Sequence, residues 1–370
     1  MTGDRALVRT AWCGVIAALI GGGGAIWGYL NAPQAFFVAW LAAFHFWLSM
    51  PLGALALLLI WDLTGGEWEV LARVPLRAMA ATMPLFILLF LPVVAGMPEL
   101  YAWSRPENAG LLHNRWYLNQ TFFLSRAAAY FVIWNGLVAW RLLRPRPSGG
   151  GASPHWQWIS GLGVMLLGYS ASYAGIDWIM STEPDWFSSI YGMVVGSGQF
   201  ITSLSCALVV IAFTGRPPDP RRLAALATIL LVVVIFWAYV SFCQWLIVWE
   251  ENLRAEIGWY IERWRGAWGA TIYALAGGQF LVPFLVLVWS PAKRRAGLVG
   301  AVGVLLLVTS LVQVWWLLLP PFHGNGFTWL APAVALGMGG LWVLAALLAL
   351  RFPSRRAMAR RAPAEEAVHG

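Results

Sequence analysis

The sequence predicts an all-α polytopic membrane protein with ten transmembrane helices. Of its 370 residues, 60% are hydrophobic and 11% are charged, whereas about 25% of the residues in soluble globular domains are charged. Apolar runs long enough to cross a bilayer recur along the chain, and basic residues gather in alternate loops between them. We therefore expect residues 1–370 to form a single membrane domain, with no stretch left for a soluble domain.

The expected spans follow from the length of the apolar runs, because a helix needs about 20 mostly apolar residues to cross the hydrocarbon core. The first run follows Arg5 and Arg9, is too long for the apolar part of a signal peptide, and lacks a small-residue cleavage site. We expect it to be an uncleaved span. The ten expected spans are residues 7–30, 35–61, 75–97, 120–143, 156–180, 184–213, 222–249, 267–290, 296–319 and 328–350.

The positions of the basic residues predict the orientation, because loops rich in Lys and Arg stay in the cytoplasm. With a cytoplasmic N-terminus, eighteen of the 24 Lys and Arg residues fall in cytoplasmic segments. These are Arg5, Arg9, Arg73, Arg77, Arg141, Arg144, Arg146, Arg216, Arg221, Arg222, Lys293, Arg294, Arg295, Arg351, Arg355, Arg356, Arg360 and Arg361. We expect both termini to be cytoplasmic. Residues 351–370 should form a basic tail that faces anionic lipid rather than nucleic acid.

The cysteines give no sign of a redox centre. Cys13, Cys206 and Cys243 each lie within an apolar run, and the chain has no C-x-x-C pair and no haem-attachment motif. We expect no metal site and no covalently bound cofactor in this chain.

Polar residues inside the expected spans are the candidate functional groups, because they are costly in hydrocarbon unless they face the bundle interior. His45 lies about ten residues into the second span, near the middle of the membrane. Tyr173 and Asp177 share a face of the fifth span, and Tyr239 and Glu250 share a face of the seventh. We expect these faces to point inward. For the Ser, Thr and Gln residues of the spans, hydrogen bonding between helices is the alternative role, and for His45 the alternative is a neutral core histidine held by a hydrogen bond.

The segment D-W-I-M-S-T-E-P-D-W, which starts at Asp177, concentrates acidic residues between two apolar runs. Thr182, Pro184 and Asp185 have the spacing of a helix N-terminus, so we expect Thr182 to cap the sixth span. Asp177 lies instead near the carboxyl end of the fifth span, where the helix dipole disfavours an anion. Arg126 lies at a similar depth in the fourth span, and we predict that it pairs with Asp177.

Four segments together resemble those of the NrfD-like (polysulfide-reductase-like) family of membrane subunits, in particular the F subunit of alternative complex III. They are L-G-A-L-A-L-L-L-I-W-D-L-T-G-G-E-W (52–68), Y-L-N-Q-T-F-F-L-S-R (117–126), D-W-I-M-S-T-E-P-D-W-F-S-S-I-Y-G (177–192) and F-W-A-Y-V-S-F-C-Q-W-L-I-V-W (236–249). The resemblance covers residues 35–290, and the segments occur in the family's order.

The resemblance implies two four-helix bundles, residues 35–180 and 184–319, flanked by the first and last helices. It also implies a subunit of a bacterial quinol:cytochrome c oxidoreductase in the inner membrane. The expected partners are a sister NrfD-like subunit that binds quinol, an iron–sulfur protein and a multihaem cytochrome c. Haem and iron–sulfur would lie on those partners, and this subunit would offer a proton path.

The chain departs from the family pattern at three places. Trp61 and Asp62 replace paired histidines, Asp185 replaces another histidine, and Glu250 begins a different turn after the seventh span. Any proton path or quinone site that used those histidines would be altered here. Asp62 could instead serve the cytoplasmic mouth of the path.

The resulting hypothesis is a membrane scaffold that conducts protons between the two faces. The candidate proton-path residues are His45, Asp62, Arg126, Tyr173, Asp177, Tyr239 and Glu250. A subunit that itself oxidises quinol is the first alternative, with Tyr173, Asp177, Trp178 and Asp185 as candidate quinone-binding residues. A purely structural anchor is the second. A secondary transporter is disfavoured because the spans are rather uninterrupted.

Overall fold

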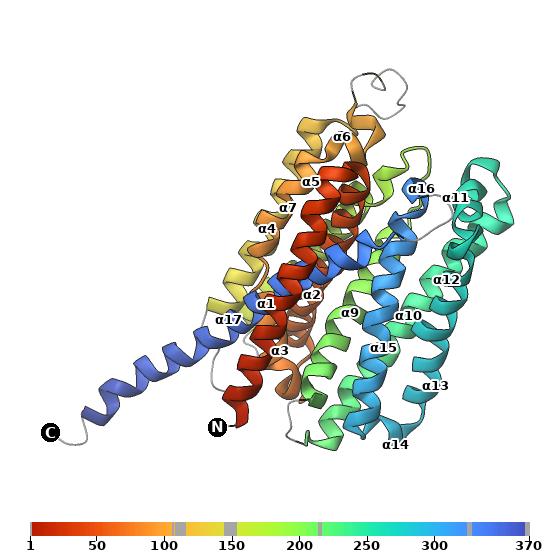
Figure 1. Cartoon of the computed structure of the whole chain (residues 1–370). Helices are drawn as coiled ribbons and strands as arrows, with labels where there is room; N and C mark the ends of the chain where they lie inside the picture. Colours follow the sequence, from red (N-terminus) through yellow and green to blue (C-terminus); the bar gives the residue numbers. More distant parts are fainter. Residues whose placement is uncertain are drawn as a thin grey trace.

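Figure 1 shows the computed structural model of the chain, which describes residues 2–105, 107, 116–143, 154–213, 217–323 and 328–366. These residues form helices and contain no strand. Within them, nine helices are long and apolar enough to cross a membrane, and a bent pair of shorter helices brings the number to ten if it counts as one span. The predicted class, an all-α polytopic membrane protein, is confirmed.

The long helices match the predicted spans in order. They are α1 (Thr2–Asn31), α2 (Pro33–Thr64), α7 (Gln120–Leu143), α8 (Pro154–Trp178), α9 (Tyr191–Phe213), α10 (Pro220–Glu251), α15 (Ala296–Leu318) and α17 (Leu330–Glu366). The eighth predicted span is α12 (Ala267–Leu275), a π-helical turn η4 (Ala276–Leu281) and α13 (Val282–Val288). Short elements between them are α6 (Met97–Leu100), η1 (Ala102–Ser104), η3 (Met180–Thr182), α11 (Arg254–Trp264), α14 (Ser290–Lys293) and α16 (Pro320–His323). Helix α17 continues into the segment that was predicted to be a separate tail.

The third predicted span, 75–97, is not one straight helix. Helix α3 (Glu69–Ala80) is followed by α4 (Leu85–Leu89) and α5 (Leu91–Ala95), and the two parts are bent by 45°. Pro84 explains the break, because proline has no N–H to donate to the carbonyl four residues earlier and its ring collides with that carbonyl. The hydroxyl of Thr82 donates to the Met79 carbonyl at 2.7 Å and accepts from the Trp342 indole at 3.1 Å, so α17 stabilises the bend.

The sixth span begins later than predicted. Helix α8 ends at Trp178, a short 3-10 turn follows, and α9 begins only at Tyr191. Thr182 does not cap α9, because its hydroxyl donates to the carbonyl of Ile179 at 2.7 Å. The predicted cap was therefore wrong. Its Thr–Pro–Asp pattern belongs to a connecting segment that is held by tertiary contacts.

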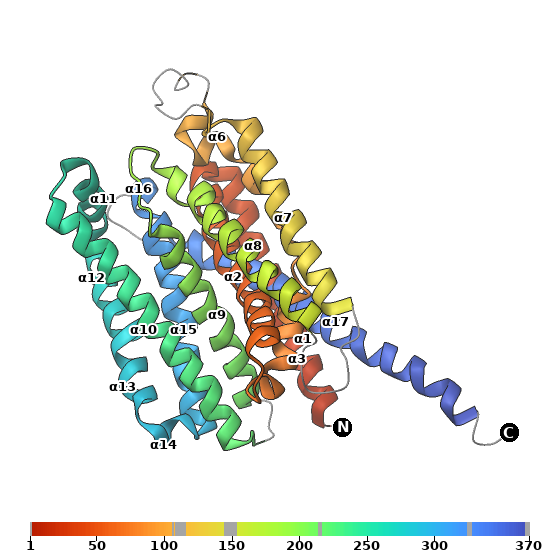
Figure 2. The same ribbon diagram turned by 180° about the vertical axis from the view of Figure 1, so that it is seen from behind.

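Helix α2 lies at the centre of the molecule (Figure 1). It packs against α3, α8, α9 and α17, and 89% of the residues in its most apolar stretch of 18 are buried. This is expected for a helix that is apolar on every side. Helices α3–α5, α7 and α8 lie to one side of it, and α10, α12, α13 and α15 lie with α9 on the other, as the opposite view in Figure 2 also shows. The first and last long helices, α1 and α17, pack against each other.

Glycines allow α1 and α17 to approach closely. A Cβ on Gly21 would overlap the backbone of Gly337, and a Cβ on Gly340 would overlap the backbone at Gly14 and Ala18. Small residues at such positions let helix backbones touch within a membrane.

Replacing Gly21 by valine is expected to lower the free energy of unfolding by about 1–3 kcal/mol, because the added carbons overpack the contact with α17. Thermal denaturation of the purified chain in detergent measures the loss. The matched control is Gly22→Val on the next residue of α1, where a Cβ would meet nothing within 4 Å. Equal losses in the two variants would contradict the close contact.

Candidate functional site

A buried ion pair joins α7 to the end of α8. The guanidinium of Arg126 donates from Nε to Oδ2 of Asp177 at 2.8 Å and from Nη2 to Oδ1 at 2.9 Å. The Asp177 side chain is fully buried, and that of Arg126 is 11% exposed. The predicted pairing is confirmed. Arg126 and Asp177 thus form a bidentate ion pair within the membrane domain.

Two tyrosines complete the surroundings of Asp177. The hydroxyl of Tyr117 donates to Oδ1 at 2.9 Å and that of Tyr130 to Oδ2 at 2.7 Å. Each carboxylate oxygen therefore accepts two hydrogen bonds, which occupies its acceptor positions. Burial and the Asp177 carboxylate also raise the pKa of Tyr117 above its ordinary value. The sequence offered a sign of Tyr130, which follows Arg126 by one helical turn, but none of Tyr117, which lies in a loop.

The four predicted quinone-binding residues occupy different settings. Trp178 is buried in an aromatic cluster that includes Phe44 and Phe90. Tyr173 was predicted to face inward with Asp177, and this was wrong: its side chain is 48% exposed on the surface of α8, whereas Asp177 is buried. Asp185 lies beyond η3, beside a separate hollow of about 320 Å³. With the four acceptor positions of Asp177 occupied, its carboxylate has none free for a quinol hydroxyl.

His45 lies deep in the molecule on α2 and is 2% exposed. Neither ring nitrogen has a hydrogen-bond partner within the part of the chain that the structure describes. The ring lines a small cavity of about 20 Å³ between α2, α9 and α15, together with Ser49, Gln199, Thr202 and Gln313. A space of this size holds about one water molecule, and its walls offer the polar partners that a buried water needs.

A polar contact extends from this cavity into the neighbouring helices. The side-chain amide of Gln279 in η4 donates to the Oε1 of Gln313 on α15 at 2.6 Å. Gln313 lines the His45 cavity, so polar groups connect α2, through α9 and α15, to the π-helical turn. Gln279 lies within the π-helical turn. Such turns inside α-helices are frequent at functional sites.

A second charged cluster surrounds Asp62 at the opposite end of α2 from Pro33. Arg141 on α7 pairs with Asp62 at 2.7 Å and lies 4.0 Å from Glu69 on α3. Ser160 of α8 donates to Asp62 at 3.2 Å, and Arg73 pairs with Glu69 at 2.6 Å. The side chains of Asp62, Glu69 and Arg141 are at most 3% exposed. Asp62 was predicted from the sequence and Glu69 was not, and Arg141 entered the predictions only through the orientation of the chain.

The predicted inward face of the seventh span was wrong. Tyr239 is 62% exposed and Glu250 is exposed at the end of α10. The buried face carries Leu226, Leu230 and Gln244 instead. Helical spacing shows which residues share a face, but it does not show which face packs inward. The structure thus separates Tyr239 and Glu250 from the buried residues His45, Asp62 and Asp177.

The end of the molecule that holds Asp177 contains a further buried ion pair. Arg263 of α11 is fully buried and pairs through both terminal nitrogens with Glu183. It also donates to the Leu317 carbonyl at 2.8 Å and lies over the Trp259 ring at 3.6 Å. Burial raises the pKa of Glu183 above its ordinary value, and Arg263 opposes this shift. Arg263 falls between the seventh and eighth predicted spans, and no local spacing pointed to its pairing with Glu183.

Chemically, the arrangement offers charge pairs near both ends of the membrane domain. Between them lies the imidazole of His45, which can take up or release a proton. Among the described residues, no group of three or more His, Cys, Asp or Glu side chains could hold a metal ion. Comparison of the sequence with models of known protein families finds no match, and comparison with curated proteins finds none either.

Proposed function

We propose that the chain is an integral membrane subunit of a quinol oxidoreductase related to alternative complex III, in a bacterial inner membrane. In this proposal it scaffolds the membrane part and provides a proton path between the two faces. It has ten spans, arranged as two four-helix bundles flanked by α1 and α17, with both termini in the cytoplasm. Quinol oxidation takes place on a sister subunit, and haem and iron–sulfur lie on further partners.

The distribution of charge supports this orientation. The N-terminus, α3 and α14 lie at one end of the molecule, and α6, α11 and α16 lie at the other (Figure 1). Arg73 and Arg77 belong to the first end, as do the basic residues at 293–295. Basic loops favour the cytoplasmic side, so the Asp62 cluster lies at the inner mouth and the Asp177 cluster at the outer end.

The observation that carries the proposal is the position of His45. The imidazole of histidine is the side-chain group whose unperturbed pKa is closest to physiological pH. An ionisable residue within a membrane is also a functional candidate by default. His45 is buried between the two groups of helices, beside a water-sized polar cavity. A single water there would give the ring a hydrogen-bond partner and a means of exchanging its proton.

The test replaces His45 by phenylalanine in the assembled complex, reconstituted in liposomes. We expect quinol-driven proton movement through this subunit to fall by about 10²-fold, the lower part of the range for a positioned proton-transfer group. Electron transfer from quinol to the acceptor should persist under uncoupled conditions. The pH change inside the vesicles and the rate of acceptor reduction are the two measurements.

The matched control is His155→Phe, the same substitution at an exposed position near the start of α8. It should leave both rates unchanged. Normal proton movement in a correctly assembled His45→Phe complex would overturn the proton-path role and leave a structural anchor. Equal loss of both rates would also overturn it, because quinol oxidation would then depend on His45.

A further inference from the structure

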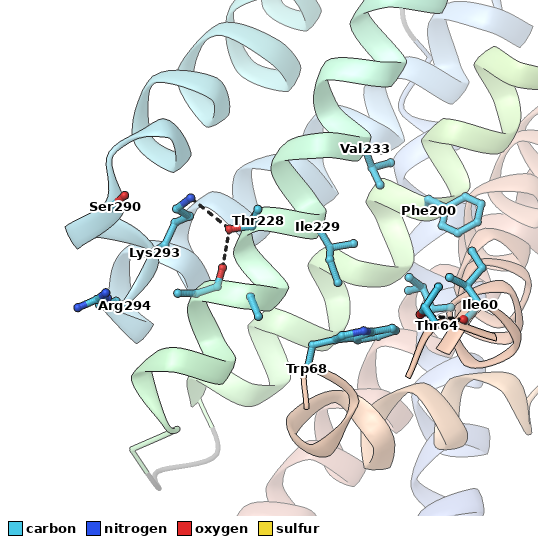
Figure 3. A pocket seen from close by; sticks show the side chains of 13 residues that line it. Ile60, Thr64, Trp68, Phe200, Thr228, Ile229, Val233, Ser290, Lys293 and Arg294 are labelled. Atoms are coloured by element: carbon cyan, nitrogen blue, oxygen red, sulfur yellow. Dashed lines mark hydrogen bonds between the residues drawn. The ribbon is translucent and has the colours of Figure 1, made fainter. Parts of the chain in front are cut away.

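A large cavity opens between the two groups of helices at the end that holds α14. It has a volume of about 700 Å³, and α2, α9, α10 and α14 contribute to its walls (Figure 3). Leu57, Phe200, Ile229 and Val233 form its apolar wall, and the indole of Trp68 lies across one side. The cavity is therefore open and largely apolar, and its volume can accommodate part of a hydrocarbon chain.

Two cations line this cavity without a neutralising acid. Lys293 donates from Nζ to the Thr228 hydroxyl at 3.1 Å, and Arg294 follows it on the same rim. Within the described residues, neither side chain forms an ion pair, and no carboxylate lines the cavity. Glu67, near Trp68 in sequence, pairs with Arg222 at 3.1 Å instead. The rim consequently has a net positive charge of two beside an apolar wall.

The second basic cavity at this end differs in charge. It has a volume of about 820 Å³ and is lined by Arg73 and Arg77 together with residues of α17. Arg73 is already paired with Glu69, and Arg77 donates to the Leu142 carbonyl at 3.3 Å. An acid therefore neutralises Arg73, and only the charge of Arg77 is left without one. The rim of Lys293 and Arg294 has the stronger demand for an external anion.

We propose that the cavity lined by Trp68, Phe200, Lys293 and Arg294 binds one anionic phospholipid. Its phosphate contacts Lys293 and Arg294, and an acyl chain lies along Phe200 and Val233. Basic pockets between transmembrane helices select anionic head groups through charge, and apolar walls retain the chain. A bound lipid would fill the space between α2 on one side and α10 and α14 on the other. The inference does not depend on the proposed function.

The test is native mass spectrometry of the full chain, delipidated in detergent and titrated with phosphatidylglycerol or phosphatidylcholine. We expect one phosphatidylglycerol to be retained in preference to phosphatidylcholine. The double variant Lys293→Gln/Arg294→Gln should bind phosphatidylglycerol about 30-fold more weakly, the factor expected for the loss of two basic residues at an anionic surface. Val233→Trp, which keeps both charges and fills the apolar wall, should also reduce retention.

The matched control is the double variant Arg254→Gln/Arg265→Gln. It removes the same charge from two exposed arginines of the α11 region, at the other end of the molecule, and should leave the affinity unchanged. Equal retention of the two lipids would overturn the proposal. So would an unaltered affinity in the Lys293/Arg294 variant, or inorganic phosphate that binds as tightly as phosphatidylglycerol.

Discussion

Replacing Asp177 by alanine is expected to lower the free energy of unfolding by about 3–5 kcal/mol, the usual cost of leaving a buried charge without its partner. Arg126, with only 11% of its side chain exposed, would lose both of its bonds to the carboxylate. Tyr117 and Tyr130 would lose the acceptor for their hydroxyl groups. Equilibrium unfolding of the purified chain in mixed micelles, followed by circular dichroism, measures the change.

The double variant Asp177→Leu/Arg126→Met separates the ion pair from the general effect of a core mutation. Removal of both charges avoids an uncompensated ion, so the double variant should be more stable than Asp177→Ala alone. The two tyrosine hydroxyls still lose their acceptor, which keeps recovery incomplete. If the losses from the single variants Asp177→Leu and Arg126→Met simply add in the double variant, the two side chains are not coupled and the ion pair is refuted.

Replacing Arg141 by alanine is expected to have an effect of similar size, about 3–5 kcal/mol. This side chain is 3% exposed and lies between two acids, Asp62 and Glu69, that are each 1% exposed. Its loss would leave Asp62 without the cation that neutralises it, although Ser160 would still donate to it. The same micellar unfolding experiment detects the change.

Arg222→Ala is the matched control for Arg141, because it breaks an ion pair of the exposed kind. Arg222 is 34% exposed and its partner Glu67 is 78% exposed, and such surface pairs contribute about 0–1 kcal/mol. Comparable losses from Arg141→Ala and Arg222→Ala would show that the inner cluster is not a buried charge network.

The sequence predicts the fold class and the order of the spans, because apolar length is a strong signal in a membrane chain. It also predicts the partner of Asp177, since few basic residues lie at that depth. The break at Pro84 and the late start of α9 lay beyond the same reasoning. Hydropathy detects apolar length but does not detect whether the helix is continuous.

The rest of the candidate site depends on which helices are neighbours. Gln279 and Gln313 are 34 residues apart, and Arg263 and Glu183 are 80 apart. No local spacing connects such pairs, so only the packing of the spans brings them together. The prediction that Tyr239 points inward was wrong for the same reason. The helices next to α10 decide which of its faces is buried.

The contact between α1 and α17 also constrains how the protein is made. The ribosome delivers α1 to the membrane long before α17, the helix that covers its glycine face. While the helices between them are made, α1 must therefore remain in lipid, or with an insertion factor, without α17. The contact can form only after α17 has been made, and a chain that stops before Leu330 would leave the glycine face of α1 without it.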